Sequence, residues 1–192
     1  MYIRDRVLPE FFDGKGTVLD VACRHGEVAR QLEMLGHEVT CVDRENVLKL
    51  FFHFTQSDLN EQGLSDVHGQ YDTIWLGDIL EHLENVHLVM VHASNMTDRV
   101  VLSVPNIGYW YYRWQNFKTG TPQFGECPPK SAWLYEHIRA FNARIIEQML
   151  NAYGFKMTKL VGVNDDKLWF QNFMCKFRPD LFASILVAEG KK

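Results

Sequence analysis

The sequence predicts an α/β fold that is doubly wound around a mostly parallel sheet of seven strands. Short apolar runs rich in β-branched residues alternate with amphipathic stretches along most of the chain, which is typical of strands joined by helices that cover both faces of a sheet. Hydrophobic residues make up 46% of the 192 residues and charged residues 23%, the mix of an ordinary globular protein. We therefore expect a single domain that spans residues 1–192.

Local signals justify each element of the first half of the chain. Glycines at positions 14, 16 and 36 mark turns. Apolar β-branched runs that are too short for a helix indicate buried strands, and apolar side chains at helical spacing indicate helices. The expected order is a helix at 2–12, a strand at 17–21, a helix at 27–35, and strands at 38–42, 50–56 and 71–76.

An aromatic-rich insertion interrupts this alternation in the second half. Pro105 ends the fifth strand, and the pattern then becomes irregular over about residues 106–140. Gly154 closes the helix that follows, as glycine often does at a helix C-terminus. The expected order is a helix at 79–94, a strand at 99–104, the insertion, a helix at 141–153, and strands at 155–163 and 182–188.

Charge, hydropathy and cysteine content argue against several classes of protein. Lys and Arg number 20 against 24 Asp and Glu, a net charge of −4, which argues against a nucleic-acid partner. No apolar run approaches the ~18–20 residues of a membrane span, and the first residues lack a signal-peptide pattern. The four cysteines form no paired CxxC spacing, so we expect reduced thiols in a cytoplasmic protein.

The candidate site lies where the parallel strands end, because open α/β sheets bind ligands beyond the carboxyl ends of their strands. Asp43 ends the second strand, 23 positions after Asp20. That is near the ~20-residue spacing at which an acidic side chain binds both hydroxyls of a ribose. Asp58, Asp78 and Asn106 follow the third, fourth and fifth strands. Each aspartate could instead cap a turn or helix, so the set indicates a site more strongly than any single member does.

Two histidines are candidate proton acceptors, since an imidazole titrates near neutral pH. His82 follows the fourth strand and His137 lies in the insertion. The alternatives are a solvent-facing helical position for His82 and a packed, structural histidine for His137. His82, His87 and His92 are five residues apart, a spacing that does not place them on one helix face, so no metal site is expected.

Several motifs resemble class I S-adenosylmethionine (SAM)-dependent methyltransferases. The likeness to their cofactor-binding half lies in VLDVACRHGEVARQLEMLGHEVTCVDRE, and the likeness to their fourth-strand motif in YDTIWLGDILEHL. The run RVVLSVPNIGYW, followed by EHIRAFN, a helix and YGF, resembles the MetW proteins and small methyltransferases of glycan and metabolite pathways. The resemblance covers about residues 15–190. It implies a Rossmann-like methyltransferase fold with SAM as cofactor.

The resemblance also implies a role for each residue of the cofactor site. Ala22 and Arg24 stand where the family usually has glycines, and Arg24 brings a long cationic side chain to a place where backbone normally approaches the cofactor. This arginine either pairs with the carboxylate of SAM or fills the pocket. The other roles are the methionine-binding turn for Asp20 and Gly26, the ribose hydroxyls for Asp43, the adenine amino group for Asp58 and the cleft near the methyl donor for Asp78.

Two functions remain open. The first is methyl transfer from SAM to a small-molecule or glycan-like acceptor by in-line displacement, for which the protein aligns the acceptor, excludes water and removes a proton. The second is a catalytically weak or inactive methyltransferase fold that binds a partner enzyme, as the resemblance to MetW allows. An NAD(P) dehydrogenase is disfavoured because the chain lacks the Gly-x-Gly-x-x-Gly fingerprint.

The insertion has a role in either function. Six of the ten residues at 109–118 are aromatic, and we expect this segment to cover the acceptor pocket. The alternative is a surface that binds a protein partner; stacking on nucleic-acid bases fits poorly with the net charge of −4. The candidate substrate-contacting residues are Asn106, Tyr109, Trp110 and Arg113.

Overall fold

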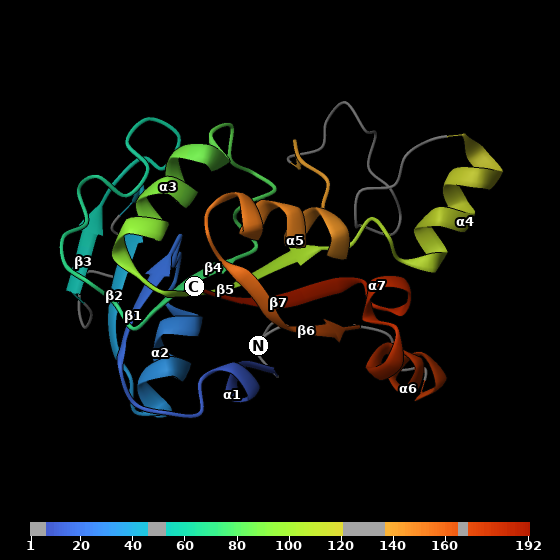
Figure 1. The fold of residues 1–192 in the computed structure, drawn as a ribbon, viewed down its shortest axis with the longest axis horizontal. Helices are drawn as coiled ribbons and strands as arrows, with labels where there is room; N and C mark the ends of the chain where they lie inside the picture. The colour runs from blue at the N-terminus through green and yellow to red at the C-terminus, as the bar shows by residue number, and fades with distance from the viewer. Residues whose placement is uncertain (1–6, 46–52, 121–136, 165–168) are drawn as a thin grey trace.

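The computed structural model describes residues 7–45, 53–120, 137–164 and 169–192, and Figure 1 shows a central sheet with helices on both faces. The strands are β1 (Thr17–Val21), β2 (Glu38–Asp43), β3 (His53–Gln56), β4 (Thr73–Gly77), β5 (Arg99–Pro105), β6 (Lys156–Val163) and β7 (Ile185–Lys191). The helices are α1 (Leu8–Phe11), α2 (Glu27–Met34), α3 (Val86–Met96), α4 (Trp110–Thr119), α5 (Ala143–Ala152), α6 (Trp169–Phe177) and α7 (Pro179–Phe182).

The strands form one seven-stranded sheet in the order β3-β2-β1-β4-β5-β7-β6. The first five strands pair in parallel, whereas β7 is antiparallel to both β5 and β6. The chain moves outward from β1 to β3 and then returns to β4 on the other side of β1, so the strand order reverses between β1 and β4. The predicted fold class is confirmed, and the reversal marks where such a sheet binds ligands.

Helices cover both faces of the sheet (Figure 1) and form a core on each. On one face Phe11 of α1 and Leu32 of α2 share a buried cluster with Trp75 of β4. On the other, Met90 of α3 and Leu150 of α5 share one with Leu76 of β4. Trp75 and Leu76 face opposite ways because side chains alternate along a strand. Burial on both faces explains why these strands appear as continuous apolar runs in the sequence.

Two predicted boundaries are wrong for identifiable reasons. The helix expected at 79–94 begins at Val86, because the side chain of Asn85 caps it by accepting a hydrogen bond from the Leu88 amide at 3.1 Å. Residues 79–85 form turns instead. The last strand was expected at 182–188 and runs over β7, because the short helix α7 occupies the residues before it.

Two helices differ from the prediction, and two predicted elements are only partly described. The insertion contains a regular ten-residue helix, α4, where the sequence predicted an irregular segment. Helix α6 was not predicted. Residues 2–6 of the first predicted helix and 50–52 of the third predicted strand lie outside the described residues. None of the described helices has the length and apolar character to cross a membrane.

Acidic side chains at the amino-terminal edge of the parallel strands have direct partners. The amide and hydroxyl of Thr17 donate to Asp72 at 2.7 and 3.0 Å and hold the pKa of Asp72 below its usual value. Glu189 is buried beside Arg99, with a nitrogen–oxygen distance of 2.7 Å. Burial raises the pKa of Glu189, but hydrogen bonds from Thr158 and Arg99 outweigh this and lower it overall.

Candidate functional site

A cavity of about 480 Å³ lies at the carboxyl ends of β1, β2 and β4. Its walls come from the turn after β1, the end of β2, and the segments that follow β3 and β4, with His137 contributed by the insertion. Six of the seven predicted cofactor residues and both candidate histidines line it; Gly26, the seventh, lies at the end of the same turn. These lining residues are Asp20, Ala22, Arg24, Asp43, Asp58, Asp78, His82 and His137.

The turn after β1 has a glycine-like backbone at three positions. The φ angles are 60° at Ala22, 49° at Arg24 and 67° at Gly26, in the left-handed region that costs an L residue roughly 1–2 kcal/mol. The Ala22 amide donates to the Val42 carbonyl at 2.8 Å and fixes the turn beside β2. The chain therefore keeps the shape of a glycine-rich turn although two of the three residues are not glycine.

Asp43 joins this turn to the end of β2. One carboxylate oxygen accepts from the Arg24 amide at 2.8 Å, and the other accepts from the Arg44 amide at 2.7 Å. The side chain also lines the cavity. Asp43 thus holds the strained Arg24 backbone in position and presents an anionic group to the cavity.

Asp58 and Asp78 stabilise the turns on the other side of the cavity. Asp58 accepts from the Asn60 amide at 3.0 Å, the capping role that the sequence left open for it. Asp78 has a φ of 49°; its amide donates to the Ser103 carbonyl at 3.0 Å and its carboxylate accepts from the Ser103 hydroxyl at 2.6 Å. Both carboxylates line the cavity as well as shaping its wall.

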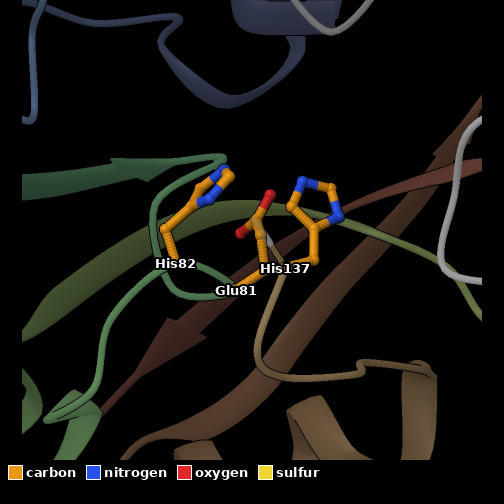
Figure 2. Close-up of side chains that lie close together, drawn as sticks. All are labelled: Glu81, His82 and His137. Atoms are coloured by element: carbon orange, nitrogen blue, oxygen red, sulfur yellow. The ribbon is translucent and has the colours of Figure 1, made fainter. Parts of the chain in front are cut away.

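Glu81, His82 and His137 meet at one end of the cavity and are called the Glu–His–His cluster below. Ligand-type atoms of all three side chains lie within 4.8 Å of one another. Figure 2 shows the carboxylate between the two imidazole rings, whose centroids are 4.6 Å apart. Glu81 is only 1% exposed, and the two histidines are half-buried. The structure thus brings together the two histidines that the sequence proposed separately.

Backbone hydrogen bonds hold the two parts of the cluster together. The amides of Ile138 and Arg139 donate to the Glu81 carbonyl at 2.9 and 3.2 Å. The Arg139 guanidinium donates to the carbonyls of Leu83 and Glu84 at 2.8 and 2.6 Å. Sequence analysis missed Glu81, because residues 79–85 were expected in a helix and the spacing of the histidines was examined along one helix only. The run Glu81-His82 within the fourth-strand motif was the available signal.

Asn106 is buried away from the cavity. It is 0% exposed, its amide nitrogen donates to the carbonyls of Ala183 and Asp180 at 2.8 and 3.1 Å, and its side-chain oxygen accepts from the Gly108 amide at 2.8 Å. These bonds tie the end of β5 to the segment before β7. Asn106 therefore has a structural role and is not brought to the cavity.

The aromatic helix α4 also lies away from the cavity. In Figure 1 it occupies the end of the molecule opposite β1, β2 and β3. Tyr109 is buried, Trp110 and Arg113 are exposed, and none of these three residues lines the cavity. The residues of α4 therefore do not line this cavity. The cover that the sequence predicts for the acceptor pocket stays a prediction, because residues 121–136 of the insertion lie outside the described residues.

Two buried thiols have pKa values above the ordinary value of a cysteine. A hydrogen bond with Cys23, burial and the nearby charge of Asp20 raise the pKa of Cys41, and burial raises the pKa of Cys175 to about 11. Cys23, Cys41 and Cys175 are free and buried, and Cys127 lies outside the described residues. Because the thiolate is the reactive form, Cys41 and Cys175 are poor nucleophiles.

The chain belongs to a methyltransferase-domain family, whose model matches residues 2–160. The resemblance to methyltransferases drawn from the motifs is thereby confirmed, while the narrower likeness to MetW stays a prediction. A comparison with curated proteins finds no match.

Solved structures of methyltransferases share the fold. A SAM-dependent methyltransferase from Archaeoglobus fulgidus is 19% identical, with a TM-score of 0.65 over 98% of this chain and 91% of that one. The 1,6-didemethyltoxoflavin-N1-methyltransferase of Burkholderia thailandensis, with bound 1,6-didemethyltoxoflavin and S-adenosylhomocysteine, is 17% identical, with a TM-score of 0.63 over 98% and 76%. The magnesium protoporphyrin IX methyltransferase of Synechocystis, with bound S-adenosylhomocysteine, is 16% identical, with a TM-score of 0.61 over 97% and 78%.

Proposed function

We propose that this protein transfers a methyl group from SAM to a small-molecule acceptor. The observation that carries the proposal is that residues assigned separately to cofactor binding and to proton transfer line one cavity. Methyltransferases of the same fold have S-adenosylhomocysteine bound, in one case with 1,6-didemethyltoxoflavin beside it. A glycan-like acceptor is the alternative that the motifs suggest.

The cavity fits SAM in size and in polar character. Its volume of about 480 Å³ is within the ~300–1,000 Å³ of small-molecule sites. Asp43 presents a carboxylate beside the turn after β1, where it can accept from both ribose hydroxyls. When bound, SAM supplies a methyl group on a sulfonium sulfur that is already activated for displacement. The other assignments are Arg24 to the methionine carboxylate, Asp20 and Gly26 to the methionine-binding turn, Asp58 to the adenine amino group and Asp78 to the cleft near the methyl donor.

The remaining tasks of the chain are to orient the acceptor, exclude water and accept a proton. His82 and His137 line the same cavity as the cofactor residues, and we assign the removal of the acceptor proton to the Glu–His–His cluster. The buried carboxylate of Glu81 beside the two rings stabilises positive charge that develops there.

The test is transfer of isotopically labelled methyl from SAM to a panel of small acceptors with hydroxyl or amine groups. We expect turnover with at least one acceptor in the wild type and a large loss in His137→Gln. A matched control is His87→Gln, since His87 is exposed and pairs with the Tyr153 hydroxyl outside the cavity. Equal turnover in the two variants would remove His137 from the mechanism.

Exposed aromatic residues on α4 favour a second candidate function, the binding of a protein partner. Trp114 is 49% exposed and Phe117 is 91% exposed, and α4 lies away from the cavity (Figure 1). The test is the double variant Trp114→Ser with Phe117→Ser. Unchanged turnover with loss of a defined complex supports a partner surface, whereas a raised KM for the acceptor supports the predicted cover.

We also propose that the protein works in a reducing, cytoplasmic compartment. Cys23 and Cys41 are close enough to interact but remain free thiols, the state expected where disulfides are rare. Mass spectrometry of protein alkylated in intact cells is the direct test, and a disulfide between them would contradict the proposal.

A further inference from the structure

The donor set of the Glu–His–His cluster is that of a metal site. It offers one carboxylate oxygen and two imidazole nitrogens, all within 4.8 Å of one another. Catalytic zinc sites use three protein ligands of these types and keep a fourth position open. Magnesium and calcium instead prefer ligand sets made of oxygen. We propose that Glu81, His82 and His137 bind one divalent transition-metal ion, with zinc as the best match.

The ligand atoms of the Glu–His–His cluster need only a modest shift to bind a metal. Zinc–ligand bonds of ~2.0–2.2 Å in a tetrahedron place ligand atoms about 3.3–3.6 Å apart. Because the ligand atoms of the cluster lie within 4.8 Å of one another, metal binding requires a contraction of at most about 1.5 Å. The amides of Ile138 and Arg139 hold His137 near Glu81 through the Glu81 carbonyl. Because those bonds use only backbone atoms of Glu81, its carboxylate and both imidazoles can rotate into place without disturbing them.

Burial adds a reason for a cation at this position. The Glu81 side chain is 1% exposed, so its carboxylate loses most of its hydration on folding. Buried charges are usually paired with an opposite charge or coordinate a metal. A divalent ion held by Glu81 and the two half-buried rings would place positive charge beside this carboxylate from the side of the cavity, which His82 and His137 line.

A metal here also defines the class of acceptor, an inference that rests on the proposed function. The fourth coordination position of such a metal would face the cavity that we assign to SAM. A ligand for this position is an acceptor with a phenolic or enolic hydroxyl. A Lewis acid favours loss of the hydroxyl proton to solvent water. The oxygen keeps the electron pair of the O–H bond and forms the new bond to the methyl carbon, while the pair of the sulfur–carbon bond returns to sulfur. The metal then takes the place of a free imidazole base.

The experiment is calorimetric titration of Zn²⁺ into metal-free wild-type protein, with Co²⁺ absorption spectra as a second measurement. His82→Ala, His137→Ala and Glu81→Gln each remove one ligand, and His87→Ala is the control outside the cavity. We expect one zinc per chain in the wild type and in His87→Ala. The dissociation constant should rise in each cluster variant by more than the ~10–100-fold that loss of an outer-shell partner costs.

Titration of S-adenosylhomocysteine into the same proteins separates this proposal from the proposed function. Zinc binding that depends on the cluster, with no nucleoside binding, supports the metal site and contradicts the proposed function. Nucleoside binding without stoichiometric zinc, or zinc binding unaffected by His137→Ala, overturns the metal site and leaves an acid–base cluster. If Glu81→Gln fails to fold, the two histidine variants decide the question.

Discussion

The two edges of the parallel strands use acidic side chains in different ways. At the amino-terminal edge, Asp72 and Glu189 are bound by neighbouring side chains, including a hydroxyl and a guanidinium. At the carboxyl edge, Asp43 accepts from backbone amides of the turns around the cavity, and Asp78 accepts from the hydroxyl of Ser103 on β5. Acidic residues at the first edge hold strands together, whereas those at the second edge shape a site and line it.

Backbone strain follows the same division. In the described part of the chain, the non-glycine residues with positive φ are Ala22, Arg24 and Asp78. All three line the cavity. Such conformations cost free energy and persist where the surroundings enforce them, often at functional sites. The comparison therefore predicts that changes at the amino-terminal edge affect stability, and that changes at the cavity edge affect ligand binding.

The largest expected effect is on stability, at Glu189. We expect Glu189→Ala to lower the free energy of unfolding by about 3–5 kcal/mol, because it leaves the Arg99 guanidinium without its partner in a mostly buried ion pair. Urea denaturation measures this. The control is Glu10→Ala, whose exposed pair with Lys159 at 3.7 Å contributes ~0–1 kcal/mol. Similar losses in both variants would contradict the contrast between buried and exposed pairs.

The next effect is on binding, at Asp43. Asp43→Asn should weaken the binding of SAM by roughly 1–3 kcal/mol, the scale of a charge-assisted hydrogen bond. The amide can still accept from the Arg24 backbone, so most of the turn should remain. Calorimetric titration measures the affinity, with Asp72→Asn as the matched control at the opposite edge. Unchanged affinity in Asp43→Asn would end its assignment to the ribose.

Arg24 combines backbone strain with a proposed ligand contact, and two variants separate the two effects. Arg24→Gly should raise the free energy of unfolding by about 1 kcal/mol because glycine adopts positive φ without penalty, whereas Arg24→Ala keeps the strain. Both variants should weaken SAM binding if the guanidinium pairs with its carboxylate. If the wild type does not bind SAM but Arg24→Gly does, the arginine instead fills the pocket. Strong binding unchanged in both variants would contradict either role.

The smallest expected effect is the pH dependence that Asp72 contributes. Hydrogen bonds from Thr17 lower the pKa of Asp72 below its ordinary value of 3.8, so its contribution is complete above that pH and is lost as the pH falls through the lowered pKa. Asp72 is exposed, which limits the effect to under about 1 kcal/mol. Wild type and Asp72→Asn should differ in unfolding free energy at neutral pH and converge in strong acid; a difference that persists there would refute this cause.

The strands and the aspartates that line the cavity were predictable from the sequence because they depend on local sequence patterns. Short β-branched runs predicted the strands, and the position of Asp43 and Asp78 after two of them predicted that their side chains line one cavity. The contact of His137 with Glu81 was not predictable, since it depends on backbone hydrogen bonds from Ile138 and Arg139 across a long sequence separation.

Composition alone did not show where the aromatic side chains of the insertion lie. They suggested a cover, which stays a prediction; Tyr109 and Tyr112 are buried in contact with each other, whereas Trp114 and Phe117 are exposed on α4, away from the cavity. Asn106 illustrates the same limit. A polar residue after a strand can face a ligand or bind neighbouring carbonyls, and only the tertiary structure shows that the carbonyls of Asp180 and Ala183 surround it.

The most direct test of the account is titration of S-adenosylhomocysteine into the wild-type protein, Asp43→Asn and Asp72→Asn. We propose that the cavity at the carboxyl edge binds the cofactor and that the amino-terminal edge does not take part. We expect one ligand per chain in the wild type, the same affinity in Asp72→Asn, and a clearly weaker affinity in Asp43→Asn. No binding to folded wild-type protein, or equal affinity in all three proteins, would contradict it.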